Sequence, residues 1–306
     1  MTLHIRDFRP ADAEAAADAY QAGRGHLFMT PQGVLWTATN AEAGQHFRLL
    51  LAELDGRVAG SARVTVHTDS SVPGQGSANV SVLPAARGRG AGRALLAAAE
   101  QHLTAHGVTT VHSWVDDTPE ALAFAGARGY RKGRQAHFAR LDLTGELRPV
   151  PALPPGVELR TVASFAADPS PIYRLDVAGT EDEPGEVDAA GQEYESWLEE
   201  VWRHPEQDHE LATVALVDGV PAAFSAVRTD GATRYWSAFT TTAAAFRGRG
   251  LAKLAKTDSL HRARAAGLTQ AYTNNDDSNA PMLAVNAWLG YEICASEWQF
   301  TREPTG

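Results

Sequence analysis

The sequence predicts an α/β (α+β) protein that contains two copies of one domain. A short Arg-Gly-Arg-Gly loop occurs twice, at residues 87–90 and 247–250. Each copy follows an apolar or β-branched run and precedes an alanine-rich helical pattern. The turn and helix-stop signals around the two loops also recur at nearly one spacing. A strand, a glycine loop and a helix, used twice, therefore organise the chain.

The matched signals support a tandem duplication. Arg87 and Arg247 are 160 residues apart, Gly107 and Gly267 are 160 apart, Gly129 and Gly290 are 161 apart, and the two Asp-Gly turns are 163 apart. With 306 residues, the chain is long enough for two separate cores. We expect an N-terminal domain at 1–146, a linker at 147–156 that is rich in proline, and a C-terminal domain at 157–306.

The first copy is expected to begin with a strand and a helix and to continue through a hairpin at Asp55-Gly56. Its expected strands are 3–8, 47–54, 58–67, 77–83, 108–115 and 135–143. Its expected helices are 10–22, 91–105 and 119–128, with a short helix or loop at 40–45. Gly107 and Gly129 end two of the helices, and Thr118 with Pro119 begins the last one.

The second copy repeats this order, with its hairpin at Asp218-Gly219. Its expected strands are 157–161, 211–217, 221–228, 233–241, 268–273 and 293–301. Its expected helices are 191–203, 251–266 and 279–289.

Composition limits the classes of function. Residues 1–150 carry a net charge of +1 and residues 151–306 carry −11, which together give the formal −10. An acidic chain is poorly suited to nucleic acid, so we expect no nucleic-acid partner. The single cysteine, Cys294, excludes an internal disulfide and a cysteine metal site, and it fits a reducing cytoplasm. No apolar leader or span of 18 apolar residues is seen, so we expect no membrane contact.

The negative charge is concentrated at residues 181–210, where twelve carboxylates accompany a single Arg203. The simpler interpretation is a solvated helix face and loop. The alternative is an electrostatic funnel for a cationic substrate. We expect His204 and His209 to be surface residues, because their spacing is unlike a metal site.

The glycine loops are typical of an anion cradle. Glycine lets the backbone adopt positive φ and approach a ligand, and free N–H groups at the helix start attract an anion. A dinucleotide-binding fingerprint would stand earlier in a βαβ unit and would need an acidic residue about 20 positions later. A P-loop would need Gly-Lys-Ser/Thr, which neither copy has. A plain surface turn is the remaining alternative.

These residues resemble a known family. The pattern Val82-x-Pro84-x-x-Arg87-Gly-x-Gly90-x-Gly92, and its second copy Arg247-x-x-Gly250-x-Ala252, are similar to the acyl-CoA pyrophosphate loop of the GCN5-related N-acetyltransferases (GNAT). The resemblance covers nearly the whole chain. It implies two tandem GNAT domains, each a mixed, largely antiparallel central sheet flanked by helices. It also implies acetyl-CoA as the acyl donor, no metal, and a small amine-bearing substrate as the partner.

The resemblance further implies a set of cofactor-binding residues. For the diphosphate these are Arg87, Gly88, Arg89, Gly90, Ala91, Gly92 and Arg93 in the first copy, and Arg247, Gly248, Arg249, Gly250, Leu251 and Ala252 in the second. For the acyl-carrying arm they are Val80, Val82, Thr240 and Thr242. Asn279 matches an asparagine that the family often has at the start of the helix after the fifth strand.

The family's usual general acid is a tyrosine, and both copies depart from that pattern. Ala125 and Asn286 stand at the tyrosine positions, four residues before Gly129-Tyr130 and Gly290-Tyr291. In the family, the amine attacks the thioester directly in a ternary complex. Candidate groups for the chemistry are Glu181, Asp182, Glu183, Glu193, Tyr235, Trp236 and Asn286.

We hypothesise that the second copy is catalytic, because it has Asn279 and the acidic segment. The first copy has the more complete loop, and it would bind CoA and support the structure. The opposite assignment stays open. Two other classes also remain: a non-catalytic acyl-CoA sensor, and an acyl or aminoacyl transferase that uses another donor on the same fold. The acidic balance argues against a tRNA-dependent donor.

Overall fold

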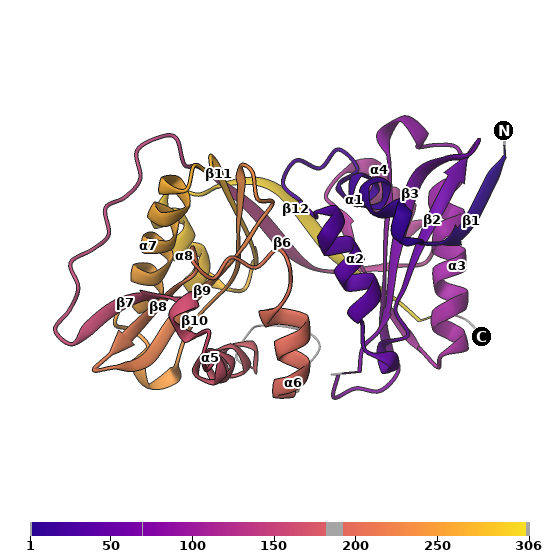
Figure 1. Ribbon diagram of the computed structural model, residues 1–306. Helices are drawn as coiled ribbons and strands as arrows, with labels where there is room; N and C mark the ends of the chain where they lie inside the picture. Colours follow the sequence, from indigo (N-terminus) through magenta and orange to yellow (C-terminus); the bar gives the residue numbers. More distant parts are fainter. Residues whose placement is uncertain (1, 69, 182–191, 304–306) are drawn as a thin grey trace. The chain divides into compact units, whose positions relative to one another are not determined.

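The computed structural model describes residues 2–68, 70–181 and 192–303. The chain divides into two compact units (Figure 1). The first unit contains Met1–Ala136 together with Ala295–Gly306, and the second contains His137–Cys294. Each unit has a mixed, mostly antiparallel sheet with helices on both faces, as the sequence predicts.

In the first unit the strands follow the order β1-β2-β3-β4-β5-β12. Their bounds are β1 Leu3–Asp7, β2 Arg48–Leu54, β3 Arg57–Val66, β4 Gln75–Val82, β5 Thr110–Asp116 and β12 Glu292–Arg302. The helices are α1 Ala13–Gln21, α2 Pro31–Asn40, α3 Ala91–Ala105 and α4 Pro119–Gly126. Figure 1 shows α1 and α2 on one face of these strands and α3 on the other.

In the second unit the order is β6-β11-β10-β9-β8-β7. The bounds are β6 Arg131–Asp142, β7 Val157–Thr161, β8 Thr213–Val217, β9 Val220–Thr229, β10 Arg234–Thr242 and β11 Gln270–Asp276. The helices are α5 Ser170–Glu181, α6 Tyr194–Trp197, α7 Leu251–Ala265 and α8 Ala280–Leu289, and a π-helical turn at Leu198–Trp202 continues α6. Helix α5 contacts β9 and β10, while α7 packs on the other face of the sheet.

The two units exchange their last strands, which differs from the boundaries expected from the sequence. Strand β12 pairs with β5 of the first unit, from Glu297 opposite Asp116 to Arg302 opposite Val111. The second half of β6 belongs to the second unit and lies next to β11. The C-terminal strand of the chain therefore completes the sheet of the first unit.

Residues 147–156, the expected linker, pack against the second unit. Leu147 is buried in the core of the second unit, and Val150 packs against a second apolar cluster there. The carbonyl of Arg148 also accepts a hydrogen bond from His261 of α7, with the two atoms 2.8 Å apart. The prolines shape a segment that belongs to the second unit.

Each unit has its own apolar core. In the first unit it contains Leu50, Leu95, Leu103 and Val111, and Phe300 of β12 joins them. In the second unit it contains Ile172, Trp197, Leu260 and Leu289. Among the described residues, none of the helices combines the length and the apolar character that a membrane span requires.

Candidate functional site

Both glycine loops lead directly into a 15-residue helix, α3 or α7. Gly90 and Gly250 are the residues before these helices, and their φ angles are +89° and +75°. Gly88 and Gly248 also have positive φ, at +74° and +75°. A Cβ at Gly88, Gly248 or Gly250 would meet no other atom within 4 Å. Glycine is thus required there for its backbone conformation rather than for space.

The loops fit a diphosphate group. The first N–H groups of a helix have no partner inside the helix, and they attract anions together with the helix dipole. Arg89, Arg93 and Arg249 are near these N–H groups in sequence, and Arg89 and Arg249 are exposed in their loops. The first arginine of each loop bonds to the preceding strand instead. Arg87 Nε donates to the carbonyl of Val82, and Arg247 Nε donates to the carbonyl of Thr242. These two bonds fasten each loop to the end of its strand.

A fork between two parallel strands opens beside each loop. In the first unit, β4 and β5 pair only from Gln75 opposite Thr110 to Ser77 opposite His112. In the second unit, β10 and β11 pair only from Arg234 opposite Gln270 to Trp236 opposite Tyr272. Beyond these pairs both strands continue without pairing to each other, so a wedge is left between them.

The two forks differ in one strand. The pairing of β10 with β9 is interrupted by a bulge between Ser237 and Phe239, which leaves Ala238 without a partner residue in β9. In the first unit, β4 pairs with β3 without interruption from Gly76 to Val82. A bulge bends a strand, releases a residue from the ladder and is over-represented beside active sites. Only the second of these two strands has that feature.

A cavity of about 200 Å³ lies beside the bulge. Its walls come from α5, the helix after it, β9 and β10, and they include Ala238 and Phe239. The aromatic walls are Trp197, Trp202, Phe224 and Phe239. The Trp197 and Trp202 rings are 5.6 Å apart, and those of Phe224 and Phe239 are 6.0 Å apart. The second unit thus has an apolar chamber next to the place where its fork opens.

Few polar groups enter this chamber: Asp176, Gln207, His209 and Arg228 are among the residues that line it. Asp176 accepts a hydrogen bond from the indole N–H of Trp197. His209 stacks on Trp202 with ring centres 4.0 Å apart, and burial lowers its pKa. The expectation that His204 and His209 lie on the surface is wrong, because His204 is buried and His209 lines the chamber. The aromatic side chains around them could not be located from sequence spacing.

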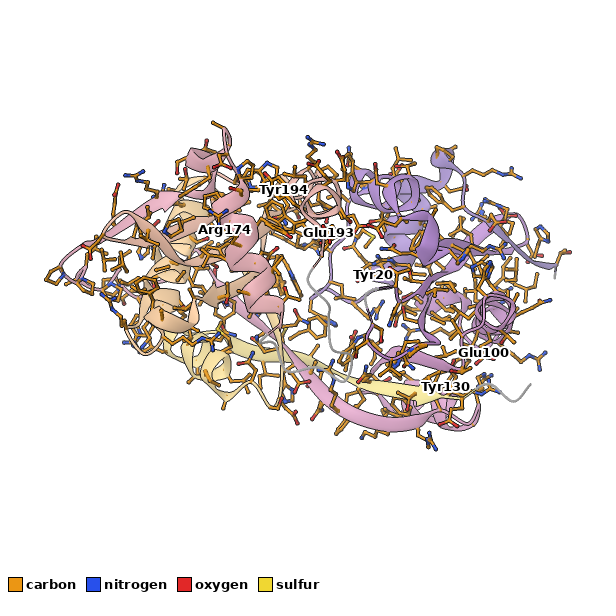
Figure 2. The ribbon with its side chains drawn as sticks, turned by 90° about the horizontal axis from the view of Figure 1, so that it is seen from below. Tyr20, Glu100, Tyr130, Arg174, Glu193 and Tyr194 are labelled. Atoms are coloured by element: carbon orange, nitrogen blue, oxygen red, sulfur yellow. The ribbon has the colours of Figure 1, made fainter. Side chains whose placement is uncertain are left out.

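The fork of the first unit holds a smaller cavity of about 90 Å³. Its lining includes Val80, Leu96, Ala125 and Tyr130. The hydroxyl of Tyr130 donates to Glu100 over 2.8 Å, so it is turned toward α3 (Figure 2). Val80 lies in the wall of this cavity.

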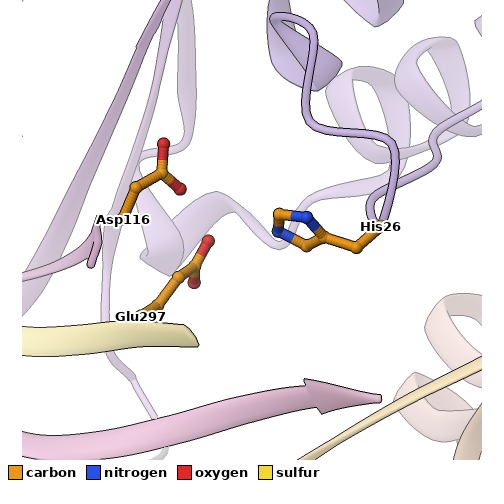
Figure 3. Close-up of side chains that lie close together, drawn as sticks. All are labelled: His26, Asp116 and Glu297. Atoms are coloured by element: carbon orange, nitrogen blue, oxygen red, sulfur yellow. The ribbon is translucent and has the colours of Figure 1, made fainter. Parts of the chain in front are cut away.

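Arg24 and Asp116 line one side of this smaller cavity. His26, Asp116 and Glu297 bring three possible ligand atoms within 4.8 Å of one another (Figure 3). Arg24 Nη1 lies 3.2 Å from Asp116 and 3.4 Å from Glu297, and Arg24 Nη2 donates to Ser81. A guanidinium already supplies positive charge to both carboxylates, so we assign no metal ion to this cluster.

At the fork of the second unit, a buried lysine takes part in a polar network that sequence reasoning missed. Lys256 of α7 has no exposed surface, and its Nζ donates to Asn286 Oδ1 over 2.6 Å. Asn286 Nδ2 donates in turn to Asn275 Oδ1, also over 2.6 Å. Burial lowers the pKa of Lys256 to about 7. A lysine inside the apolar period of a helix was the available signal.

Several expected site residues have structural roles. Tyr235 is fully buried and its hydroxyl bonds with Ser259. Asn279 caps α8 by accepting from the N–H of Met282. Thr240 bonds with Ser225. The ring of Trp236, in the same strand, is tilted against that of Phe138, with the ring centres 6.0 Å apart.

The acidic candidates are placed only in part. Glu193 is exposed at the start of α6 (Figure 2). Asp182 and Glu183 lie outside the described residues, and the side chain of Glu181 is likewise not described.

The sequence of this chain matches one protein family model. Residues 13–130 match the model of the Acetyltransferase (GNAT) family. Mycothiol acetyltransferase of Nocardia farcinica is 34% identical over 159 residues, which are 50% of this chain and 50% of that protein. Mycothiol acetyltransferase of a Nocardioides species is 28% identical over 225 residues, which are 69% of this chain and 74% of that protein. The match to the first of these relatives thus spans about half of its length.

Solved structures share the fold over the whole chain. A tandem GNAT protein from the clavulanic acid biosynthesis pathway is 23% identical, with a TM-score of 0.78 and 100% of both chains covered. A GCN5-related N-acetyltransferase from Sphaerobacter thermophilus is 21% identical, with a TM-score of 0.72, and the match covers 98% of this chain and 95% of that one.

Proposed function

Because the chain belongs to the GNAT family of acetyltransferases and has two units of its fold, we propose that the second unit is an acetyl-CoA-dependent N-acetyltransferase. The substrate would be a small molecule with an amine. The observation that carries this proposal is the bulge at Ala238, which opens onto the aromatic chamber beside the fork. The first unit has the loop and the fork but an uninterrupted β4.

On the donor side, the loop from Arg247 to Gly250 would hold the diphosphate of acetyl-CoA, which supplies the activated acetyl group. The N–H groups at the start of α7 and the exposed Arg249 provide the donors. The fork between β10 and β11 would then direct the acyl arm toward the bulge. A backbone N–H released from the ladder near Ala238 would polarise the acetyl carbonyl.

On the acceptor side, the chamber would hold the amine close to that carbonyl. An aromatic wall with one carboxylate suits an organic cation, because ring faces and Asp176 both attract positive charge. Asp176 would also receive the proton that the ammonium must lose before attack. Holding both reactants side by side in a ternary complex supplies a large part of the rate enhancement. The net charge of −11 in residues 151–306 favours the approach of a cation.

The first unit would hold a second acetyl-CoA molecule without turning it over. Its loop has the same positive-φ glycines, so it fits the diphosphate equally well. On the acceptor side of its fork, however, Arg24 already pairs with Asp116 and Glu297. An incoming ammonium would have to compete with that guanidinium for both carboxylates.

One observation favours the opposite assignment as a second candidate. Burial raises the pKa of Glu297 to about 7, which suits a general base at neutral pH. Turnover in the first unit would then require Glu297 from the exchanged strand β12. Glu297→Gln separates the two assignments: loss of turnover supports the first unit, and unchanged turnover supports the second.

Calorimetric titration with acetyl-CoA, followed by thiol release over a panel of amines, tests the function itself. The panel includes the unacetylated amine form of mycothiol, because two relatives carry the name of mycothiol acetyltransferase. We expect binding and thiol release that depends on the amine. Binding without thiol release for any acceptor would instead support an acyl-CoA sensor. Absence of acetyl-CoA binding would overturn the proposal.

A further inference from the structure

We propose that Lys256 is the proton donor for the thiolate that leaves the second unit, with Asn286 holding its ammonium group at the apex of the fork. The inference rests on the proposed function, because it assigns a role within the same site. It identifies a general acid in a unit that lacks the family's tyrosine. Asn286, at that position, would be a positioning residue, and Lys256 would be the residue that touches the reacting sulfur.

The first argument is position. Strands β10 and β11 pair up to Trp236 and Tyr272, and Thr273 is the next residue of β11. Lys256 Nζ lies 3.5 Å from Thr273 Oγ1. The ammonium is therefore at the point where the two strands separate. A thioester carried along the fork toward the bulge would bring its sulfur to this point.

The second argument is a comparison between the two units. The residues 160 or 161 positions before Lys256, Thr273 and Asn286 are Leu96, Ser113 and Ala125. All three line the fork cavity of the first unit. In the second unit, Lys256 and its amide partner Asn286 thus occupy positions whose counterparts, Leu96 and Ala125, are apolar in the first unit. This difference agrees with turnover in the second unit alone.

The third argument is the surroundings of the ammonium. Its neighbours are the amide oxygen of Asn286, the hydroxyl of Thr273 and the ring of Tyr291, whose centre is 5.2 Å away. These groups come from α8, from β11 and from the residue just before β12, and all are neutral. Burial lowers the pKa of Lys256 to about 7, and no carboxylate of the described residues forms an ion pair with it. Such a group can be protonated at neutral pH and still release its proton readily.

The step is balanced. The acceptor nitrogen forms the C–N bond, the C–S bond breaks, and its electron pair stays on sulfur. The sulfur takes a proton from Lys256 Nζ. Two protons leave the acceptor ammonium through Asp176 to solvent, and solvent returns one to Lys256. One proton is therefore released in each turnover.

The test compares Lys256→Met with Lys132→Met, which removes an exposed lysine of the first unit. The first readout is independent of turnover: the ultraviolet absorbance of the CoA thiolate, recorded while CoA is bound. A nearby ammonium stabilises the thiolate, so Lys256→Met should lower the thiolate fraction in the second unit about tenfold at one pH. The Gly90→Glu background confines this reading to the second unit. Lys132→Met should leave it unchanged.

The second readout is the pH profile of kcat. In the parent protein kcat should fall as the pH rises through the pKa of Lys256, because the donor must be protonated. Lys256→Met should lower kcat about 100-fold and remove that limb. If Lys256→Met does not fold, Asn286→Leu keeps the lysine but not its partner, and it should shift the thiolate fraction in the same direction.

Failure of the proposed function and failure of the role of Lys256 give different results. If Gly250→Glu leaves turnover intact, the proposed function is wrong whatever Lys256 does. If Gly250→Glu abolishes turnover while the Lys256 variant, or its Asn286 substitute, keeps both the thiolate fraction and the pH limb, the role of Lys256 is overturned.

Discussion

Trp197 donates its indole N–H to Asp176, so the carboxylate in the chamber is held in place by one of the aromatic walls. Asp176→Asn keeps an oxygen that can accept this hydrogen bond but removes the negative charge. We expect KM for the amine to rise at least tenfold, or about 1.4 kcal/mol, while the affinity for acetyl-CoA stays unchanged. Steady-state kinetics over the amine concentration measure this effect.

Glu158→Gln is the matched control for this prediction, because Glu158 is an exposed carboxylate of β7 in the same unit. It should leave KM unchanged. Equal KM values for Asp176→Asn and the parent protein would show that the amine binds elsewhere.

Gly179 lies where α5 crosses β10. A Cβ there would be 2.5 Å from Thr241 Oγ1 and 2.9 Å from Phe239 Cε1. Gly179→Ala should therefore push α5 away from the chamber and destabilise the second unit by roughly 1–3 kcal/mol. Thermal unfolding measures the loss. Gly126→Ala in α4 is the control, because its Cβ would meet no atom within 4 Å. It should be neutral, or stabilising by up to about 1 kcal/mol. Equal melting temperatures for the two variants would contradict the close approach.

Glu297 should make the first unit less stable as the pH rises. Burial raises the pKa of Glu297 to about 7, whereas a glutamate in an unfolded chain titrates near 4.3. Between these values the folded state binds more protons than the unfolded state, so the free energy of unfolding falls with rising pH. The stabilisation that the protonated Glu297 carboxyl gives the folded state is complete below pH ~4 and is lost by about pH 7.

Glu297→Gln removes this dependence. Relative to the parent protein, the melting temperature of Glu297→Gln should rise as the pH increases from 5 to 8. The rise should correspond to a free energy of unfolding of at most roughly 3 kcal/mol. A constant difference across this range would show that the carboxyl group does not hold a proton in the folded state.

Local sequence signals predicted the helices that follow the two glycine loops at residues 87–90 and 247–250. Helices α3 and α7 begin immediately after Gly90 and Gly250, because no other residue adopts positive φ as easily. The Asp-Gly hairpins and the glycine stops are equally local. Helix α2 was missed, although Thr30 caps it and Pro31 is its first residue. That signal was present in the sequence.

The exchange of β6 and β12 was not predictable from these signals. Both strands follow a helix and a glycine stop, and their alternating patterns specify a strand without specifying its neighbour. The choice depends on long-range pairs such as Glu297 with Asp116. The chamber and the Lys256 network are also products of packing, since Asp176, Lys256 and Asn286 are far apart in sequence.

The comparison of Gly250→Glu with Gly90→Glu tests the central claim most directly. Each variant places a bulky anion at a positive-φ position in one glycine loop and leaves the other glycine loop intact. Thiol release from acetyl-CoA with an accepted amine is the measurement. We predict that Gly250→Glu abolishes turnover and that Gly90→Glu retains it. Loss of turnover in Gly90→Glu alone would contradict catalysis by the second unit.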